Sequence, residues 1–208
     1  MSATVQRTRR RQQREETRSQ ILAAAQEFLR EHPYRELSVD ALMTRTGHSR
    51  TVFYRHFEDI PALMLTLITE VGGELVEVSE EWRRSTRVSP QEARQRLARY
   101  VDFYVRNGRL IRAVVEASHH DAQVGQAYNG LVEGFIALTA TAIEQRVGSG
   151  DVAPVDDAPE VARAMVWMLN GYLLDRLSRP EPADRELVLQ TVSMIWSRVL
   201  FPAAATNR

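Results

Sequence analysis

The sequence of 208 residues contains neither cysteine nor lysine. The lack of cysteine excludes disulfides, cysteine nucleophiles and thiolate metal ligands, and it is typical of a reducing compartment. The lack of lysine means that any contact to phosphate must come mainly from arginine. No run approaches the roughly 18 apolar residues that a membrane span needs, and the N-terminus lacks the apolar run of a secretory signal. We therefore expect a cytoplasmic protein.

Charge is spread unevenly along a chain whose net charge is zero. Residues 1–58 hold 11 Arg against 7 acidic residues, whereas residues 59–208 hold 16 Arg against 20. Nucleic-acid affinity comes largely from neutralised phosphates, so this asymmetry favours a small basic end that meets a polyanion. A chance fluctuation of four charges is the alternative. The composition, with 44% hydrophobic and 26% charged residues, is that of an ordinary globular protein.

Apolar residues recur with the 3.6-residue period of helices, and strand patterns of consequence are missing. This predicts an all-α protein with about nine helices. The expected helices run from about Glu16 to Glu31, Ser38 to Gly47, Ser49 to His56, Asp59 to Trp82, Ser89 to Asn107, Leu110 to Ala117, Val124 to Arg146, 158 to 178 and 184 to 200. Residues 1–16 are rich in arginine and have nothing to bury, which predicts a disordered tail. The expected domains are then 17–62 and 63–208.

Residues 38–57 predict a helix-turn-helix, in which the second helix enters the DNA major groove. Ser38 is a candidate N-cap, Gly47 a left-handed stop and Ser49 a second N-cap. In the second helix Phe53 and Phe57 point inward at a spacing of four. The residues left to face outward are Arg50, Thr51, Tyr54, Arg55 and His56, whereas Val52 is ambiguous.

The outward residues have side chains suited to different parts of DNA. Arg50 or Arg55 could pair with guanine, and Thr51 could contact a thymine methyl group or a phosphate. Tyr54 and His56 suit phosphate oxygens. The DNA-binding residues predicted in addition to these five are Ser38, Arg45 and Ser49. The arginine tail could reach along an adjacent groove.

Three segments together resemble the signature of the TetR family of regulators: Thr17–Ala25, Leu37–Leu42 and Gly47–Phe57. The resemblance implies a three-helix DNA-binding domain in each subunit, mounted on a larger all-α ligand-binding domain. It further implies a homodimer formed through the last two helices, at about 158–178 and 184–200. The family usually has a lysine where this chain has Ile60. We therefore expect one phosphate contact to be missing and its role to pass to Ser38, Arg45 and the arginine tail.

A second resemblance concerns the C-terminal half. The segments Met165–Tyr172 and Met194–Ser197 resemble the ethionamide-resistance regulator subgroup. That resemblance implies a long, mostly apolar pocket with Asn170 as a polar handle. Phe103, Trp167 and Trp196 would be its walls. Plain core packing is the alternative for each aromatic residue.

Glu116 and His119, followed by His120 and Asp121, have the Glu-x-x-His spacing of a carboxylate metal site. The motif occurs once, whereas a di-iron bundle needs it twice, so we interpret these residues as a solvated helix end. Phosphate-binding glycine loops and the Gly-x-Ser-x-Gly motif are also missing. We predict no catalysis, no metal and no cofactor.

The sequence thus predicts a ligand-responsive transcriptional regulator, most simply a repressor. A dimer would bind a palindromic operator and would be released by a small, largely apolar effector that tilts the helix from Asp59. The alternatives are an all-α metal-dependent or lipid-handling enzyme and a helical adaptor with an acidic partner. Both leave the polar face from Arg50 to His56 unexplained.

Overall fold

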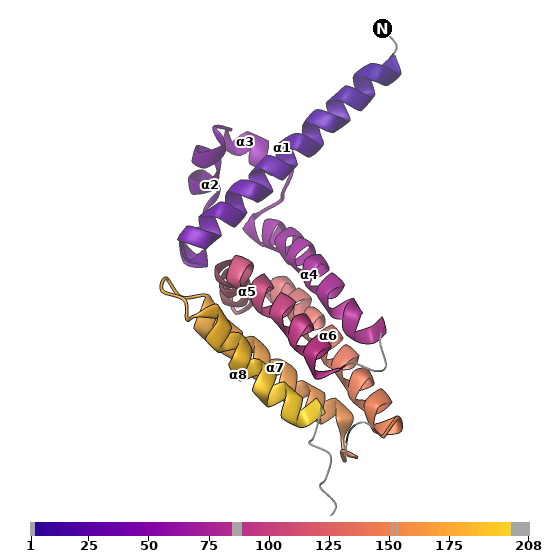
Figure 1. Ribbon diagram of the computed structural model, residues 1–208. Helices are drawn as coiled ribbons and strands as arrows, with labels where there is room; N and C mark the ends of the chain where they lie inside the picture. The colour runs from indigo at the N-terminus through magenta and orange to yellow at the C-terminus, as the bar shows by residue number, and fades with distance from the viewer. Residues whose placement is uncertain (1–2, 85–88, 151, 153, 201–208) are drawn as a thin grey trace, which may run out of the picture.

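The structure is a computed structural model that describes residues 3–84, 89–150, 152 and 154–200. These residues form eight α-helices and one short 3-10 helix, and no strand is found among them (Figure 1). The elements are α1 (Ala3–Glu31), η1 (Tyr34–Glu36), α2 (Val39–Thr46), α3 (Arg50–Tyr54), α4 (Ile60–Arg84), α5 (Pro90–Ser118), α6 (Ala122–Gly148), α7 (Ala158–Leu177) and α8 (Arg185–Leu200). The all-α prediction is confirmed, with one α-helix fewer than expected.

Helices α1 to α3 form a small unit at one end of the molecule, and α4 leads from it into a bundle with α5 to α8 (Figure 1). Ion pairs tie neighbouring bundle helices together. Arg185 grips the Asp102 carboxylate with two hydrogen bonds of 2.5 and 2.8 Å, which joins α8 to α5. Arg163 and Glu133 join α7 to α6 in the same way, at 2.6 and 2.9 Å. None of the described helices is long and apolar enough to cross a membrane.

The local signals around α2 are confirmed. Ser38 Oγ accepts a hydrogen bond from the backbone N–H of Ala41, and Gly47 has a φ of 69°, a left-handed conformation that suits glycine. Asp59 caps α4 by accepting from the N–H of Ala62 at 2.8 Å. Ser49 occupies the N-cap position of α3 as predicted, but its side chain makes no capping hydrogen bond. Its backbone carbonyl accepts from the N–H of Val52 at 2.9 Å.

The structure differs from the sequence prediction at the N-terminus. Helix α1 begins at Ala3 rather than at about Glu16, so residues 3–16 are helical and the prediction of a disordered tail is wrong. The physical reason is that Arg, Gln and Glu are good helix formers, and they extend a helix that the buried residues from Ile21 to Leu29 already hold in place. Arg11 and Glu15 add an ion pair one turn apart, at 2.9 Å.

Helix α5 also continues where a break was predicted, at Asn107 and Gly108. A Cβ atom on Gly108 would lie 3.2 Å from the carbonyl oxygen of Leu177, so glycine allows α5 to approach the end of α7 closely. The Asn107 side chain donates to Glu74 of α4 at 3.3 Å. Both residues therefore serve packing between helices, and two expected helices merge into one.

Two hydrophobic cores organise the molecule, and the smaller one crosses the predicted boundary at residue 62. We call it the N-terminal core. Residues of α1 to α4 form most of it, and the more distant elements α5 and α6 complete it. These distant members are Leu110, Ala113, Val114, Ala117 and Val124. The second half of α5 is thus part of the packing of the N-terminal unit.

Candidate DNA-binding face and bundle cavity

Helix α3 and the turn that follows it are held in place by two aromatic residues. Phe53 and Phe57 are buried, with ring centroids 5.7 Å apart, and Val52 is half-buried. The outward side chains Arg50, Thr51, Tyr54 and Arg55 are all exposed, Tyr54 by 52%. The structure therefore brings four of the five outward residues to an accessible surface of the N-terminal unit.

Arg50 is held by a contact that DNA could replace. Its Nη1 lies 3.1 Å from Oδ2 of Asp40 in α2, and the two side chains are 60% and 66% exposed. An ion pair so open to water contributes little stability. A phosphate or a guanine edge can therefore compete with Asp40 for the guanidinium group.

Arg45, by contrast, is engaged inside the N-terminal unit. It pairs with Glu31 of α1 at 2.5 Å and lies over the Phe28 ring at 5.3 Å. This guanidinium joins α2 to α1, yet Arg45 is exposed, and its contact to phosphate stays a prediction. Ser38 and Ser49 are both exposed, although the Ser38 hydroxyl oxygen also caps α2. Ile60 is half-buried and packs against the N-terminal core.

His56 departs from the predicted outward set. Its ring is half-buried, and Nδ1 is enclosed without a hydrogen-bond partner among the described residues. Burial lowers the pKa of this imidazole, and the positive charges of Arg14, Arg18 and Arg55 lower it further. The ring is therefore less accessible than the other four outward residues, and its surroundings favour the neutral form.

Helix α1 contacts the end of this surface through Arg14, which belongs to the predicted arginine tail, and through Arg18, which was not predicted. Arg14 Nη2 donates to the carbonyl oxygen of Arg55 at 3.3 Å. Arg18 lies 5.0 Å above the Phe57 ring and donates to Thr66 at 3.1 Å. The signal that could have found Arg18 is the spacing of arginines by three and four along residues 7–18.

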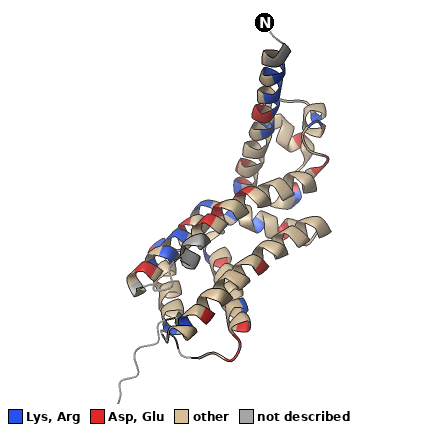
Figure 2. Ribbon diagram, turned by 90° about the vertical axis from the view of Figure 1, so that its right-hand side faces the viewer, with Lys and Arg blue, Asp and Glu red and all other residues tan. Residues whose placement is uncertain are grey.

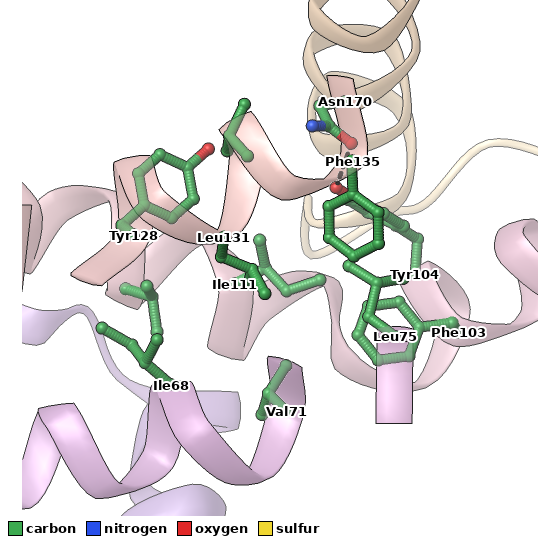
Figure 3. Close-up of a pocket in the computed structure, with 12 residues that line it drawn as sticks. Ile68, Val71, Leu75, Phe103, Tyr104, Ile111, Tyr128, Leu131, Phe135 and Asn170 are labelled. Atoms are coloured by element: carbon green, nitrogen blue, oxygen red, sulfur yellow. Dashed lines mark hydrogen bonds between the residues drawn. The ribbon is translucent and has the colours of Figure 1, made fainter. Parts of the chain in front are cut away.

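A small cavity lies in the bundle between α4, α5, α6 and α7 (Figure 3). Its volume is about 40 Å³, and its walls are almost entirely apolar. The residues that line it are Ile68, Val71, Leu75, Phe103, Tyr104, Ile111, Val114, Tyr128, Leu131, Val132, Phe135 and Asn170. A space of this size holds a few water molecules at most, so the side chains nearly fill it.

Asn170 is the main polar group at this cavity. Its Oδ1 accepts hydrogen bonds from the hydroxyls of Tyr104 at 2.9 Å and Tyr100 at 3.3 Å (Figure 3 shows Tyr104 and Asn170). Burial raises the pKa of both tyrosines, which therefore remain neutral donors. The Asn170 amide nitrogen makes no side-chain hydrogen bond among the described residues, which leaves two N–H donors for another acceptor.

Phe103 and Asn170 thus lie at one cavity, whereas the two predicted tryptophans do not. Trp167 is 46% exposed on α7, and Trp196 is buried in the larger core without lining the cavity. Tyr100 and Tyr104 were not predicted at this site. The sequence signal for them was their spacing of four residues, which puts both side chains on one face of a helix.

The N-terminal unit has a second attachment to the bundle besides α4. Glu116 Oε2 accepts from the backbone N–H of Tyr34 at 3.2 Å, and the His120 ring stacks on Tyr34 with centroids 6.5 Å apart. Arg109 donates to the carbonyl oxygen of Arg30 at 2.8 Å. Glu116 is therefore a half-buried joint between α5 and the segment after α1, which corrects its interpretation as part of a solvated helix end.

Comparison with known proteins agrees with this geometry. Residues 21–67 match the family model described as "Bacterial regulatory proteins, tetR family". Residues 93–201, more than half of the chain, match the model of the C-terminal domain of the transcriptional regulator EthR. The chain belongs to the TetR family. It is a DNA-binding transcriptional regulator of the helix-turn-helix type.

Individual relatives of this TetR-family chain include the "HTH-type transcriptional regulator EthR" of Mycolicibacterium smegmatis, which is 27% identical over 186 residues, or 87% of this chain and 84% of that protein. EthR of Mycobacterium tuberculosis is 27% identical over 179 residues, or 85% of this chain and 83% of that protein. A TetR-family protein from Rhodococcus has the same fold, with a TM-score of 0.74, 15% identity and coverage of 90% and 98% of the two chains.

Proposed function

We propose that this TetR-family chain is a dimeric repressor that binds a palindromic operator and is released by a small, largely apolar effector. The observation that carries the proposal is the N-terminal core. It joins α3, which presents exposed Arg50, Thr51 and Tyr54, to the same α5 helix that lines the bundle cavity. As a repressor the protein would work in the cytoplasm and would need no catalysis.

The exposed apolar residues of the last two helices support a homodimer. Large side chains of α7 and α8 are 42% to 53% exposed in the single chain. They are Trp167, Met168, Leu187 and Met194. Packing α7 and α8 against their copies in a second subunit would bury them. In such a dimer the two α3 helices would enter major grooves one turn apart, about 34 Å.

The effector class follows from the cavity walls. Apolar side chains select an apolar ligand, and the free N–H groups of Asn170 select one that carries a hydrogen-bond acceptor such as a carbonyl. Pockets for small molecules usually measure about 300–1,000 Å³, far more than the roughly 40 Å³ present here. The ligand must therefore displace side chains that line the cavity, which include those of α4 and α5, in order to enter.

That displacement gives the proposed switch its physical basis. Ile68 of α4 and Val114 of α5 line the cavity and also belong to the N-terminal core. Enlarging the cavity moves both helices against the unit that carries α3. The ligand shifts the equilibrium between the two states only by its preference for the state with the enlarged cavity. Part of its binding free energy is therefore used to change the separation of the two α3 helices.

The DNA-binding part is tested with an operator duplex selected by the full-length protein from a randomised pool. We expect salt-dependent binding that the Arg50→Ala/Tyr54→Ala double variant loses, because both side chains are exposed on α3. The matched control is Arg179→Ala, which removes an exposed charge of the bundle. Binding unchanged in the double variant would refute the proposal.

The effector part is tested with pairs of probes of equal length, a medium-chain alkyl ketone and the corresponding alkane. We expect the ketone to raise the melting temperature and to release the duplex at lower concentration than the alkane, because only the ketone can accept from Asn170. Equal effects of the two probes, or no release by either, would contradict the proposed effector class.

A further inference from the structure

The N-terminal part of α1, residues 3–18, carries five of its six arginines on one side. At 3.6 residues per turn, five of them fall within about 100° of the helix circumference. We call them the arginine stripe: Arg7, Arg10, Arg11, Arg14 and Arg18. Arg9 lies on the opposite side of the helix. Figure 2 shows the basic residues gathered on this end of α1, beyond the rest of the N-terminal unit.

The stripe is continuous with the surface of α3. Its C-terminal members touch the end of that helix, since Arg14 donates to the Arg55 carbonyl and Arg18 lies over Phe57. The remaining members are exposed and continue in line away from the bundle (Figure 1). From Arg18 to Arg7 the stripe covers about 16 Å of helix. Guanidinium groups therefore form a row that begins beside exposed Arg55.

The two outermost arginines, Arg7 and Arg10, have no polar side-chain partner within the described part of the chain. Among the described residues, the side chains of Arg7 and Arg10 make no ion pair or hydrogen bond, and Arg11 has only the open pair with Glu15, where the side chains are 82% and 66% exposed. A row of unpaired cations costs folding free energy through repulsion, which a polyanion would relieve.

We propose that the arginine stripe is a second DNA-binding element, a rigid helix that follows the phosphate backbone beside the half-site contacted by α3. It differs from a flexible basic arm because the helix fixes which charges face DNA. The partner is double-stranded DNA, since the row starts at the DNA-binding face. The inference rests on the proposed operator binding.

The first test compares two neighbouring single variants, Arg7→Gln on the stripe and Arg9→Gln on the opposite side. Both remove one charge from an exposed helical position, and glutamine retains helix propensity. Removing one arginine that neutralises a phosphate should reduce the slope of log K against log salt by about 0.9, or about 1.8 for a dimer. We expect that reduction for Arg7→Gln and less than half of it for Arg9→Gln, with unchanged melting temperatures.

The second test separates a fixed stripe from general basicity. The double variant Arg10→Gln/Gln12→Arg moves one charge to the far side of α1 at constant composition, and we expect it to lose as much operator affinity as Arg10→Gln alone. If the double variant restores wild-type affinity, or if Arg7→Gln and Arg9→Gln behave alike, a fixed stripe is refuted.

Loss of binding in Arg50→Ala/Tyr54→Ala, with all stripe variants at wild-type affinity, would refute only this inference. A wild-type protein that binds no duplex would refute both proposals.

Discussion

His56 was predicted to face DNA, and the structure half-buries its ring. Its lowered pKa means that the folded state prefers the neutral ring more than the unfolded chain does. The unfolded chain then binds more protons just below the ordinary pKa of 6.5, and stability falls as the pH decreases through this region. We expect wild-type protein to lose melting temperature between about pH 7.5 and about pH 5.5.

The variant that isolates this effect is His56→Gln, which cannot take up the proton. Its melting temperature should fall less over the same pH range. His119→Gln, which changes an exposed ring, should behave as the wild type does. An identical pH dependence in His56→Gln and wild type would show that this ring titrates normally.

The hydrogen bonds to Asn170 lead to a prediction about the free energy of unfolding. Asn170→Ala removes the acceptor of two buried hydroxyls, and an unsatisfied buried group costs about 1–3 kcal/mol in the free energy of unfolding. Tyr104→Phe removes one donor and leaves the Tyr100 bond in place, so we expect a loss of about 1 kcal/mol. Urea unfolding measures both. A loss in Asn170→Ala no larger than the loss in Tyr104→Phe would mean that leaving the Tyr100 hydroxyl without its acceptor costs little.

At the scale of the helices, two glycines provide a matched pair. Gly73 of α4 has open space where a Cβ would stand, whereas on Gly108 of α5 the Cβ would meet the Leu177 backbone at 3.2 Å. Alanine gains about 1 kcal/mol over glycine in a helix interior. We expect Gly73→Ala to stabilise by up to that amount and Gly108→Ala to destabilise by about 1 kcal/mol or more, because backbone cannot yield easily. Thermal unfolding measures both effects. A raised melting temperature in both variants would show that α5 and α7 can move apart at little cost.

Helix boundaries were predictable where neighbouring residues determine them. Ser38, Gly47 and Asp59 act as the sequence indicates because a cap needs only the adjacent turn. Asn107 and Gly108 resemble a helix stop, but contacts with α4 and α7 override that signal. The composition of residues 1–16 suggested disorder, although their helix propensities are high.

The two predicted sites were predictable to different degrees for the same reason. The outward face of α3 follows from two buried phenylalanines within eight residues, so it depends on one short helix. The cavity depends on how four helices pack together. Phe103 and Asn170 meet there, but the helical spacing does not decide that Trp167 faces outward and Trp196 packs elsewhere.

At the scale of the whole molecule, the joint at Glu116 predicts how the two ends communicate. Glu116→Ala removes the acceptor of the Tyr34 N–H, so movement of α5 should reach the N-terminal unit less completely. Couplings between two sites usually amount to about 5–150-fold in affinity. We expect the ratio of operator affinities without and with saturating ketone to decrease several-fold in this variant.

The control for the joint is Glu116→Gln, whose amide oxygen can still accept from Tyr34. It should keep a ratio close to that of the wild type, measured by the same duplex titration. If Glu116→Ala keeps the wild-type ratio as well, the response does not depend on the Glu116–Tyr34 hydrogen bond and passes through α4 or through the α5 side chains of the N-terminal core.

The N-terminal core also limits how this regulator can be divided. A fragment that ends after α4 would lose Leu110, Ala113, Val114 and Ala117, and would leave the inner side of α1 and α4 facing water. The DNA-binding portion is thus not a portable module: grafting it onto another effector domain would require a helix that reproduces those four α5 side chains. For the same reason the whole chain should unfold in one transition, with neither end persisting alone.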